Sequence, residues 1–483
     1  MRTASLVAGV DCSTQGTKVL LVDPDSGAVV ASGRAVHTVS GDGGVRETDP
    51  REWWDALRAA LAQTGRVDEI AAISVAGQQH GLVVLDRAGV PLRKAMLWND
   101  TSAHRDSEQL TARLGADVWA ARTGLRPVAS FTVAKWAWLR RTEPEIADAT
   151  AGIRLPHDYL TERLTDRAVT DRGDASGTGW WSPSDEGYAE DIMALPEVRI
   201  ARDLLPEVLG PSQPAGEVGA AGQALGLRPG TIVGPGTGDN MAAALGLSLT
   251  AGQPAMSLGT SGTVYAVSER PIADPSGIVA GFADATGRFL PLAATLNCTL
   301  AVDRMASWLG LDRDDVRETD SVVVLPYLDG ERTPNLPAAT GTIVGLRHTT
   351  APQQILMAAY EGAVASLLQA LGAIGDSIGG LDPSAPLMLV GGGSRGTAWR
   401  EVVRRFSGRP VLIPDAVELV AIGAAAQATA AWRAEPLEGV GARWGTRSGT
   451  LLDPVPADDE RLARIQSIVR AVTTAPDLSG EIG

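Results

Sequence analysis

The chain has 483 residues, which is too long for one compact core and indicates at least two large domains. Hydrophobic residues make up 44% and charged residues 20%, so the composition is that of a globular protein and not of a disordered one. The net charge is −15 with no basic block, which argues against nucleic acid or an anionic membrane as the main partner.

Several features favour the cytoplasm by elimination. The only cysteines are Cys12 and Cys298, with no C-x-x-C pair, which fits a reducing compartment. The N-terminus runs into a strand-like segment without the charged and apolar regions of a signal peptide. The longest alanine-rich apolar stretch, residues 417–432, is too short and too weakly hydrophobic for a membrane span and predicts a buried helix.

Strand-like and helical patterns alternate along the chain. Runs of β-branched and apolar residues predict strands at residues 6–10, 19–22 and 83–85. Helical spacing predicts helices over residues 50–61 and 351–371, and two adjacent apolar rows give the second helix a broad apolar face. The alternation predicts an α/β protein with mixed sheets.

A repeat relates the two halves of the chain. Residues 11–17 (DCSTQGT) and 257–263 (SLGTSGT) each lie between two apolar strands, and aligned without gaps they share three of seven residues. A second possible pair, residues 232–239 and 389–394, consists of strands that end in glycine loops before helices. We therefore expect two similar domains with a ligand cleft between them. Their predicted ranges are residues 1–245 and 246–483.

The two hairpins favour phosphate binding, because glycine, hydroxyls and exposed amides at a tight turn can hold phosphate oxygens. One copy alone is better explained as an ordinary β-hairpin turn, but two matched copies favour phosphate binding. The candidate phosphate-binding residues are Ser13, Thr14, Gln15, Gly259, Thr260 and Ser261. Asp11 has Ser257 as its counterpart, and a single carboxylate beside a triphosphate usually serves its magnesium ion, often through water.

A run of three glycines and a serine follows a late apolar strand. Such a run permits close approach of a nucleotide or forms a packing turn. The candidate nucleotide-binding residues are Gly391, Gly392, Gly393 and Ser394. No P-loop motif is present. With Gly396 the run satisfies the G-x-G-x-x-G pattern, and Asp415 lies near the spacing of a ribose-binding acid. The late position of this pattern in the chain nevertheless disfavours a dinucleotide-binding fold.

Polar residues at the other strand ends suggest a sugar site. Asp239, followed by Asn240, lies at the mouth of a glycine loop. Its residue type alone fits a helix N-cap, whereas the inferred cleft favours catalysis. Sugars need dense hydrogen bonding and an aromatic face, although a lone histidine is more often structural. The candidate sugar-binding residues are Gln79, His80, Trp98, Asn99, Asp100, Asp239 and Asn240.

Together these motifs resemble the FGGY family of carbohydrate kinases, over nearly the whole chain. The matching segments, in family order, are residues 11–14, 130–139, 238–240, 257–262, 341–346 with 361–362, and 391–394. Within the family, residues 76–81, 97–100, 155–160 and 326–334 are similar to the branch that phosphorylates D-xylulose. Gln79 departs from the Met of many members of this branch, and Ser13 departs from a common Gly.

The resemblance implies two actin-like (ribonuclease H-like) domains that close on ATP and a ketose, and a homodimer. It implies that Asp239 accepts the proton of the C5 hydroxyl and that Asp11 serves Mg²⁺. Three alternatives remain open: a kinase of the same family for another ketose or polyol such as D-ribulose, an actin-like ATPase without sugar kinase activity, and a sugar-sensing regulator. The regulator is disfavoured because no DNA-reading helix-turn-helix is evident.

Overall fold

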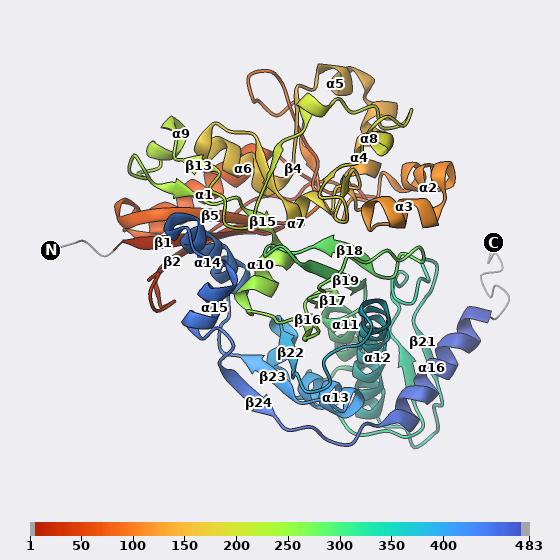
Figure 1. The fold of residues 1–483 in the computed structure, drawn as a ribbon. Coiled ribbons are helices and arrows are strands. Elements are labelled where there is room, and N and C mark those ends of the chain that lie inside the picture. The colour runs from red at the N-terminus through yellow and green to blue at the C-terminus, as the bar shows by residue number, and fades with distance from the viewer. Residues whose placement is uncertain (1–4, 475–483) are drawn as a thin grey trace. The chain divides into compact units, whose positions relative to one another are not determined.

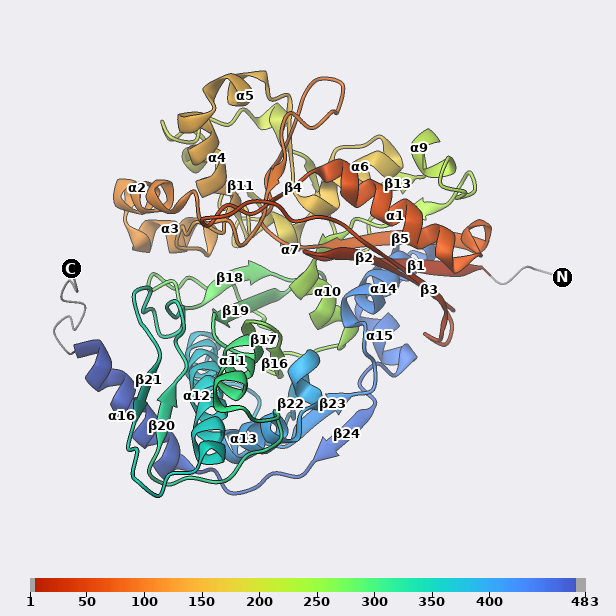
Figure 2. The same ribbon diagram turned by 180° about the vertical axis from the view of Figure 1, so that it is seen from behind.

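The computed structural model describes residues 5–474, which form two compact units (Figures 1 and 2). The first unit comprises residues up to 249, residues 268–290 and residues 416–448. The second comprises residues 250–267, residues 291–415 and residues from 449 onward. The first compact unit thus includes two segments, 268–290 and 416–448, that come after the predicted boundary at residue 245. The division of the sequence into domains 1–245 and 246–483 stays a prediction.

The sheet of the first unit has the strand order β13-β14-β5-β1-β2-β3, with β15 attached to β5. β1 runs antiparallel to β2 and parallel to β5, β14 is parallel to β5, and the outer strands β3 and β13 are antiparallel to their neighbours. The strand bounds are β1 Leu6–Cys12, β2 Gly16–Val22, β3 Val29–Val36, β5 Ile70–Gly77, β13 Gly216–Glu217, β14 Ile232–Val233 and β15 Thr237–Gly238.

Helices cover both faces of this sheet (Figure 1). The alternate residues of β1 from Leu6 to Cys12 join one apolar core with Trp53 of α1 (Pro50–Thr64) and Tyr159 of α6 (Pro156–Thr165). The opposite face packs on α14 (Leu419–Arg433) so closely that a Cβ on Gly9 would lie 1.8 Å from the backbone oxygen of Ala421. Because side chains alternate along a strand, Asp11 belongs to the α14 face.

Short strands and helices inserted between these elements complete the first unit. The remaining strands are β4 Glu47–Thr48, β6 Val83–Leu85, β7 Ala95–Met96, β8 Gly152–Arg154, β9 Val169–Asp171, β10 Trp181–Ser182, β11 Gly187–Tyr188, β12 Glu207–Leu209 and β18 Ala280–Ala283. The remaining helices are α2 His104–Leu114, α3 Ala116–Thr123, α4 Thr132–Thr142, α5 Pro144–Ala149, α7 Arg172–Ala175, α8 Glu190–Met193, α9 Ala220–Gln223, α10 Asp239–Gly246 and α15 Glu438–Trp444.

The second unit repeats the topology of the first. Its sheet has the order β24-β23-β22-β16-β17-β19-β18. From β24 to β19, every pair of neighbours runs in the same relative direction as the matching pair in the first unit. The strand bounds are β16 Pro254–Leu258, β17 Gly262–Ala266, β19 Phe289–Thr295, β20 Val323–Leu325, β21 Thr342–Val344, β22 Leu387–Val390, β23 Val411–Pro414 and β24 Gly449–Leu452. The helix bounds are α11 Thr299–Leu309, α12 Pro352–Ile378, α13 Thr397–Ser407 and α16 Asp459–Thr474. This duplicated mixed sheet confirms the predicted α/β class.

The structure corrects two details of the predicted repeat. Cys12 pairs with Thr17 in the first hairpin, whereas Leu258 pairs with Gly262 in the second, so the second loop is one residue shorter and the gapless alignment slips. The second predicted pair is wrong, because β14 matches β23 and β22 matches β5 in strand order. Glycine loops occur at several strand ends, so composition alone did not identify the equivalent ones.

Among the described residues, α12 alone is long and apolar enough to cross a membrane by length and composition. However, 78% of its most apolar window is buried inside the protein. The predicted helix at residues 351–371 is confirmed and extends to Ile378, and it is buried nearly all round between Leu356 and Leu367. α12 is therefore a core helix of the second unit.

Candidate active site

Asp239 is the first residue of α10, and the N-cap position belongs to Gly238. Its carboxylate oxygen Oδ1 accepts hydrogen bonds from the backbone N–H and from Nδ2 of Asn240, at 2.8 and 2.9 Å. Asn240 Nδ2 also donates to Oε1 of Gln79 at 2.9 Å. Burial raises the pKa of Asp239 to about 6, although the bonds from Asn240 act in the opposite direction. The geometry therefore holds a carboxylate of tuned basicity beside an amide pair.

Asp11 is buried at the end of β1, with 8% of its surface exposed. Burial raises the pKa of its carboxyl to about 7; the charge of Asp239 adds to the rise and that of Lys18 opposes it. Lys18 itself forms an ion pair with Glu418 at 2.6 Å. Oδ1 of Asp11 is buried without a hydrogen-bond partner among the described residues. A buried carboxylate oxygen with no protein partner fits a ligand of a hard divalent cation, directly or through water.

Within residues 5–474, no group of three or more histidine, cysteine or acidic side chains is arranged to hold a metal ion. A cation at Asp11 would therefore need oxygens from water and from a phosphate to complete its coordination, as is usual for magnesium bound with nucleotides.

Gln79 and His80 follow β5, next to the loop that carries Asp239. His80 has a φ of +67°, a left-handed conformation that is uncommon outside glycine. Its ring lies edge-on to Phe131 at 5.0 Å and tilted against Phe282 at 5.4 Å. Neither phenylalanine was predicted to have a role, and Phe282 lies in the segment 268–290, about two hundred residues after His80.

His80 is also held by a close backbone approach. A Cβ on Gly177 would lie 2.4 Å from the His80 ring, so this position accepts only glycine unless the ring moves. The strained backbone and the packed ring fix the direction in which the loop presents its polar groups.

Trp98, Asn99 and Asp100 follow β7, which a bridge between Leu82 and Met96 brings beside the His80 loop. Trp98 donates from Nε1 to Oγ1 of Thr14 at 3.0 Å, so its indole contacts the first hairpin. Both oxygens of Asp100 accept backbone N–H bonds, from Arg46 at 2.7 Å and Ser102 at 2.8 Å. Asp100 thus holds a turn, whereas Oδ1 of Asn99 is buried without a partner in the described part of the chain.

In the second unit, the hairpin loop 259–261 joins the start of α11. The backbone oxygen of Gly259 accepts from the backbone N–H and the hydroxyl of Thr299, at 3.1 and 2.8 Å. Thr260 is exposed at the tip of this loop and Ser261 is half-buried beside it. The loop is therefore anchored through its backbone, and Thr260 at its tip is accessible.

The glycine run after β22 lies against the same hairpin. Gly391 has a φ of +85°, and a Cβ there would lie 2.7 Å from the backbone oxygen of Leu258. A Cβ on Gly393 would lie 2.7 Å from the side chain of Leu258, whereas one on Gly392 would meet nothing within 4 Å. Ser394 donates its hydroxyl to the backbone oxygen of Gly391 at 2.8 Å. Close packing explains two of the three glycines, and it brings this loop beside the second hairpin.

A duplicated mixed sheet of this topology, with a polar hairpin after the first strand of each copy, is the architecture of the actin-like fold. The N-terminal domain model of the FGGY family of carbohydrate kinases matches residues 6–246, and the C-terminal domain model matches residues 255–432. The chain belongs to the FGGY family of carbohydrate kinases. It is accordingly an ATP-dependent sugar kinase with two actin-like domains, as the sequence motifs predicted.

Curated relatives and solved structures agree with this assignment. The chain is 58% identical to the xylulose kinase of Streptomyces coelicolor and 56% identical to that of Streptomyces rubiginosus, in each case over 96% of both chains. The crystal structure of xylulose kinase from Bifidobacterium adolescentis matches with a TM-score of 0.83 at 33% identity, covering 96% of this chain and 99% of that one.

Proposed function

We propose that this chain transfers the γ-phosphoryl group of ATP to the C5 hydroxyl of D-xylulose and forms D-xylulose 5-phosphate, in the catabolism of xylose. The observation that carries the proposal is a pair of carboxylates beside the amide of Gln79: the buried Asp11 at the end of β1, and the half-buried Asp239 after β15. Both strands pair with β5. The similarity to relatives named xylulose kinase supports the choice of sugar.

Asp239 acts as the general base in this proposal. With a pKa of about 6 it is ionised at pH 7.5, yet it is more basic than an exposed aspartate. Proton transfer comes late, after bonding to phosphorus has made the hydroxyl more acidic, because phosphoryl transfer has a loose transition state. Asn240 and Gln79 orient the carboxylate, and the polar groups of His80 and Trp98 orient the ketose.

ATP is proposed to be bound by backbone and hydroxyl groups. Ser13, Thr14 and Gln15 in one unit, and Gly259, Thr260 and Ser261 in the other, bind phosphate oxygens. Residues 391–394 pass close to the adenosine end. Mg²⁺ held by Asp11 would neutralise charge on the β- and γ-phosphates.

A coupled assay of ADP release over a panel of ketoses and polyols tests the substrate. We expect kcat/KM for D-xylulose to exceed that for D-ribulose and for sugar alcohols by at least tenfold. Preference for D-ribulose or a polyol would favour the other substrate class within the family. ATP turnover that no sugar changes would favour an ATPase.

The remaining sequence predictions stand as proposals. They are a division into functional domains at residues 1–245 and 246–483, a cytoplasmic location, a homodimer, and no nucleic-acid or membrane partner. Light scattering coupled to size-exclusion chromatography tests the homodimer, for which we expect about twice the 50.1 kDa chain mass.

A further inference from the structure

His157 is a fully buried histidine that the proposed reaction does not use. It is the second residue of α6, and its Nε2 lies 3.2 Å from Asp158 Oδ1, 3.5 Å from Asp171 Oδ1 and 3.3 Å from Asp174 Oδ2. None of the three carboxylates is more than 4% exposed. One imidazole therefore faces three carboxylates in a buried site.

The imidazole lies directly under two loops of the candidate active site. A Cβ on Gly236, which has a φ of +79°, would lie 2.5 Å from Nδ1 of His157. A Cβ on Gly77 would lie 3.0 Å from the backbone nitrogen of His157. Gly77 leads into Gln79, and Gly236 leads into Asp239. Because β15 pairs in parallel with the end of β5, both loops leave the sheet at the same edge.

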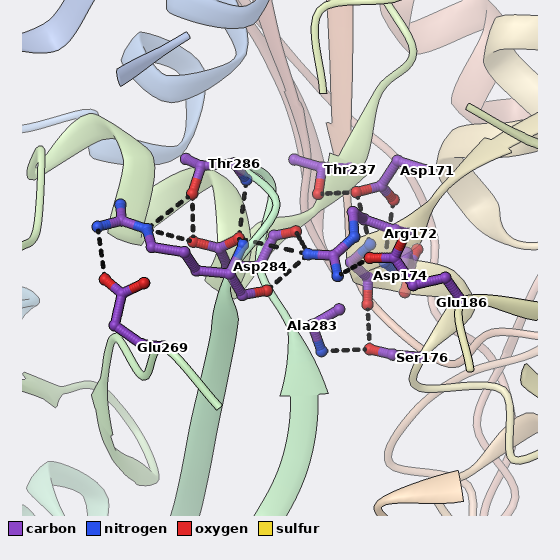
Figure 3. A network of polar contacts seen from close by, with 12 residues as sticks. Asp171, Arg172, Asp174, Ser176, Glu186, Thr237, Glu269, Ala283, Asp284 and Thr286 are labelled. Carbon is purple, nitrogen blue, oxygen red and sulfur yellow. Dashed lines mark hydrogen bonds and ion pairs between the residues drawn. The ribbon is translucent and has the colours of Figure 1, made fainter. Parts of the chain in front are cut away.

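A hydrogen-bonded path joins the cluster to the Asp239 loop (Figure 3). The hydroxyl of Thr237 donates to Oδ2 of Asp171 at 2.7 Å. Asp171 also caps α7 by accepting from the backbone N–H groups of Gly173 and Asp174, each at 2.9 Å. A Cβ on Gly173 would lie 2.9 Å from the side chain of Met241 in α10, so α7 also packs closely on the helix that Asp239 begins.

The charges of the surrounding elements favour a protonated imidazole. Burial lowers the pKa of His157, but the carboxylates of Asp158, Asp171 and Asp174 outweigh it and raise the pKa to about 9. Burial raises the pKa of Asp174 well above its usual range, and the charge of His157 is the largest influence that lowers it.

Two arginines near the cluster do not replace the imidazolium. Arg154 of β8 lowers the pKa of Asp158 only as a minor cause, and it is paired with Glu162. Arg172 is directed to Glu186 and to the backbone oxygen of Arg288 (Figure 3). Removal of a charge from such a buried group leaves its partners uncompensated.

We propose that His157, as an imidazolium, is a positioning residue that fixes Asp171 and, through the Asp171–Thr237 bond, the backbone that carries Asp239. This inference rests on the proposed role of Asp239 as base. His157 does not touch the substrate and transfers no proton. Loss of the His157 charge should therefore lower kcat and leave the KM for ATP unchanged. A displaced base slows the phosphoryl-transfer step, whereas the nucleotide loops are not altered.

The test compares His157→Gln, which removes the charge, with His157→Lys, which keeps a cation. We expect His157→Gln to lower kcat at least tenfold with the KM for ATP within twofold, and His157→Lys to recover most of that loss. Thr237→Val, which removes only the bond to Asp171, should lower kcat by a similar factor. His104→Gln, on a side chain that is 72% exposed, is the matched control and should leave kcat unchanged.

A spectroscopic measurement separates this inference from the proposed function. In ¹⁵N-histidine-labelled protein, the signal lost in His157→Gln should show the imidazolium form at pH 7.5, whatever the role of Asp239. A neutral imidazole there, a folded His157→Lys as slow as His157→Gln, or a Thr237→Val with normal kcat would overturn the inference. If His157→Gln does not fold, Thr237→Val and the spectrum of the unmodified protein still decide it. An active Asp239→Asn variant would overturn the base assignment and, with it, the effect of His157 on kcat, whereas the imidazolium signal of His157 would remain.

Discussion

The two sheets share one strand order and one set of directions, but their strand ends carry different chemistry. At the end of the first hairpin strand, the first unit has the buried Asp11 where the second has the half-buried Ser257. After the matching parallel strand, the first unit has Gln79 and His80 where the second has the glycines from Gly391. One scaffold therefore presents titratable and amide side chains in one copy, among which Asp11 and Gln79 are buried, and backbone and hydroxyl groups in the other.

Under the proposed roles of these residues, the two copies of the fold divide the work of phosphoryl transfer. A base and a metal ligand need pKa values set by burial and neighbouring charge, so their side chains must be enclosed. Phosphate binding needs only amides and hydroxyls at accessible turns, which glycine provides. The sheet topology fixes where the loops are, and the side chains on those loops fix what each unit does.

Replacement of Asp239 should have the largest effect on activity. We expect Asp239→Asn to lower kcat for D-xylulose by about 10³, because general bases contribute about 10²–10⁴. ATP affinity, measured by calorimetry, should stay within threefold. The control is Asp203→Asn at an exposed site. A kcat within tenfold of the unmodified enzyme would contradict the assignment.

Asp11 and its counterpart Ser257 allow a direct comparison of the two hairpins. We expect Asp11→Asn to lower kcat by about 10² and to raise the Mg²⁺ concentration needed for half-maximal rate, because one negative ligand is lost. Ser257→Ala should change kcat less than threefold. The measurement is the rate as a function of Mg²⁺ concentration for both variants. Equal changes in kcat and in the Mg²⁺ requirement would show that the two hairpins do not differ in metal binding.

The division of labour also predicts opposite changes in KM. Thr260→Val should raise the KM for ATP about tenfold while the KM for D-xylulose stays within twofold, because a bond to phosphate is worth about 1–1.5 kcal/mol. Gln79→Ala should instead raise the KM for D-xylulose about tenfold while the KM for ATP stays within twofold. Initial-rate measurements with each substrate varied in turn test both. A change in both KM values by either variant would remove the distinction between the units.

Burial of Asp11 should reduce stability at neutral pH. Its pKa rises from 3.8 to about 7 on folding, so the stability it contributes is complete below about pH 4 and is lost as the pH rises through 7. Without Mg²⁺, Asp11→Asn should exceed the unmodified protein in free energy of unfolding by on the order of 3 kcal/mol at pH 8. Urea unfolding at several pH values measures this. A difference independent of pH would contradict the raised pKa.

Local patterns in the sequence predicted much of the fold. The strand expected at residues 6–10 is β1, and the helix expected at residues 50–61 is α1, because apolar periodicity reports burial of neighbouring residues. The match between β22 and β5 was not predicted, since glycine marks many tight turns without stating their place in a sheet. Strand order depends on pairings that are distant in sequence.

The same limit applies to the site. Asp11, Gln79 and Asp239 were predicted because each is a polar residue at or just after the end of an apolar strand, beside a turn that contains glycine. His157 and Phe282 were missed, because their partners come from separate elements. His157 meets the end of β5 and the loop before Thr237, and no sequence spacing connects these segments to it.

A pair of glycines in the second unit gives the smallest and most local test. Gly391 has a φ of +85° and no room for a Cβ, whereas its neighbour Gly392 has open space. We expect Gly391→Ala to lower the free energy of unfolding by about 2 kcal/mol and to raise the KM for ATP, because the loop must move away from Leu258. Gly392→Ala should change stability by less than about 0.5 kcal/mol. Urea unfolding and ATP kinetics on both variants distinguish a loop shaped by packing from one shaped by nucleotide contact. If Gly391→Ala were neutral in stability and Gly392→Ala raised the KM for ATP, the nucleotide, and not the hairpin of its own unit, would be the reason for the glycine run.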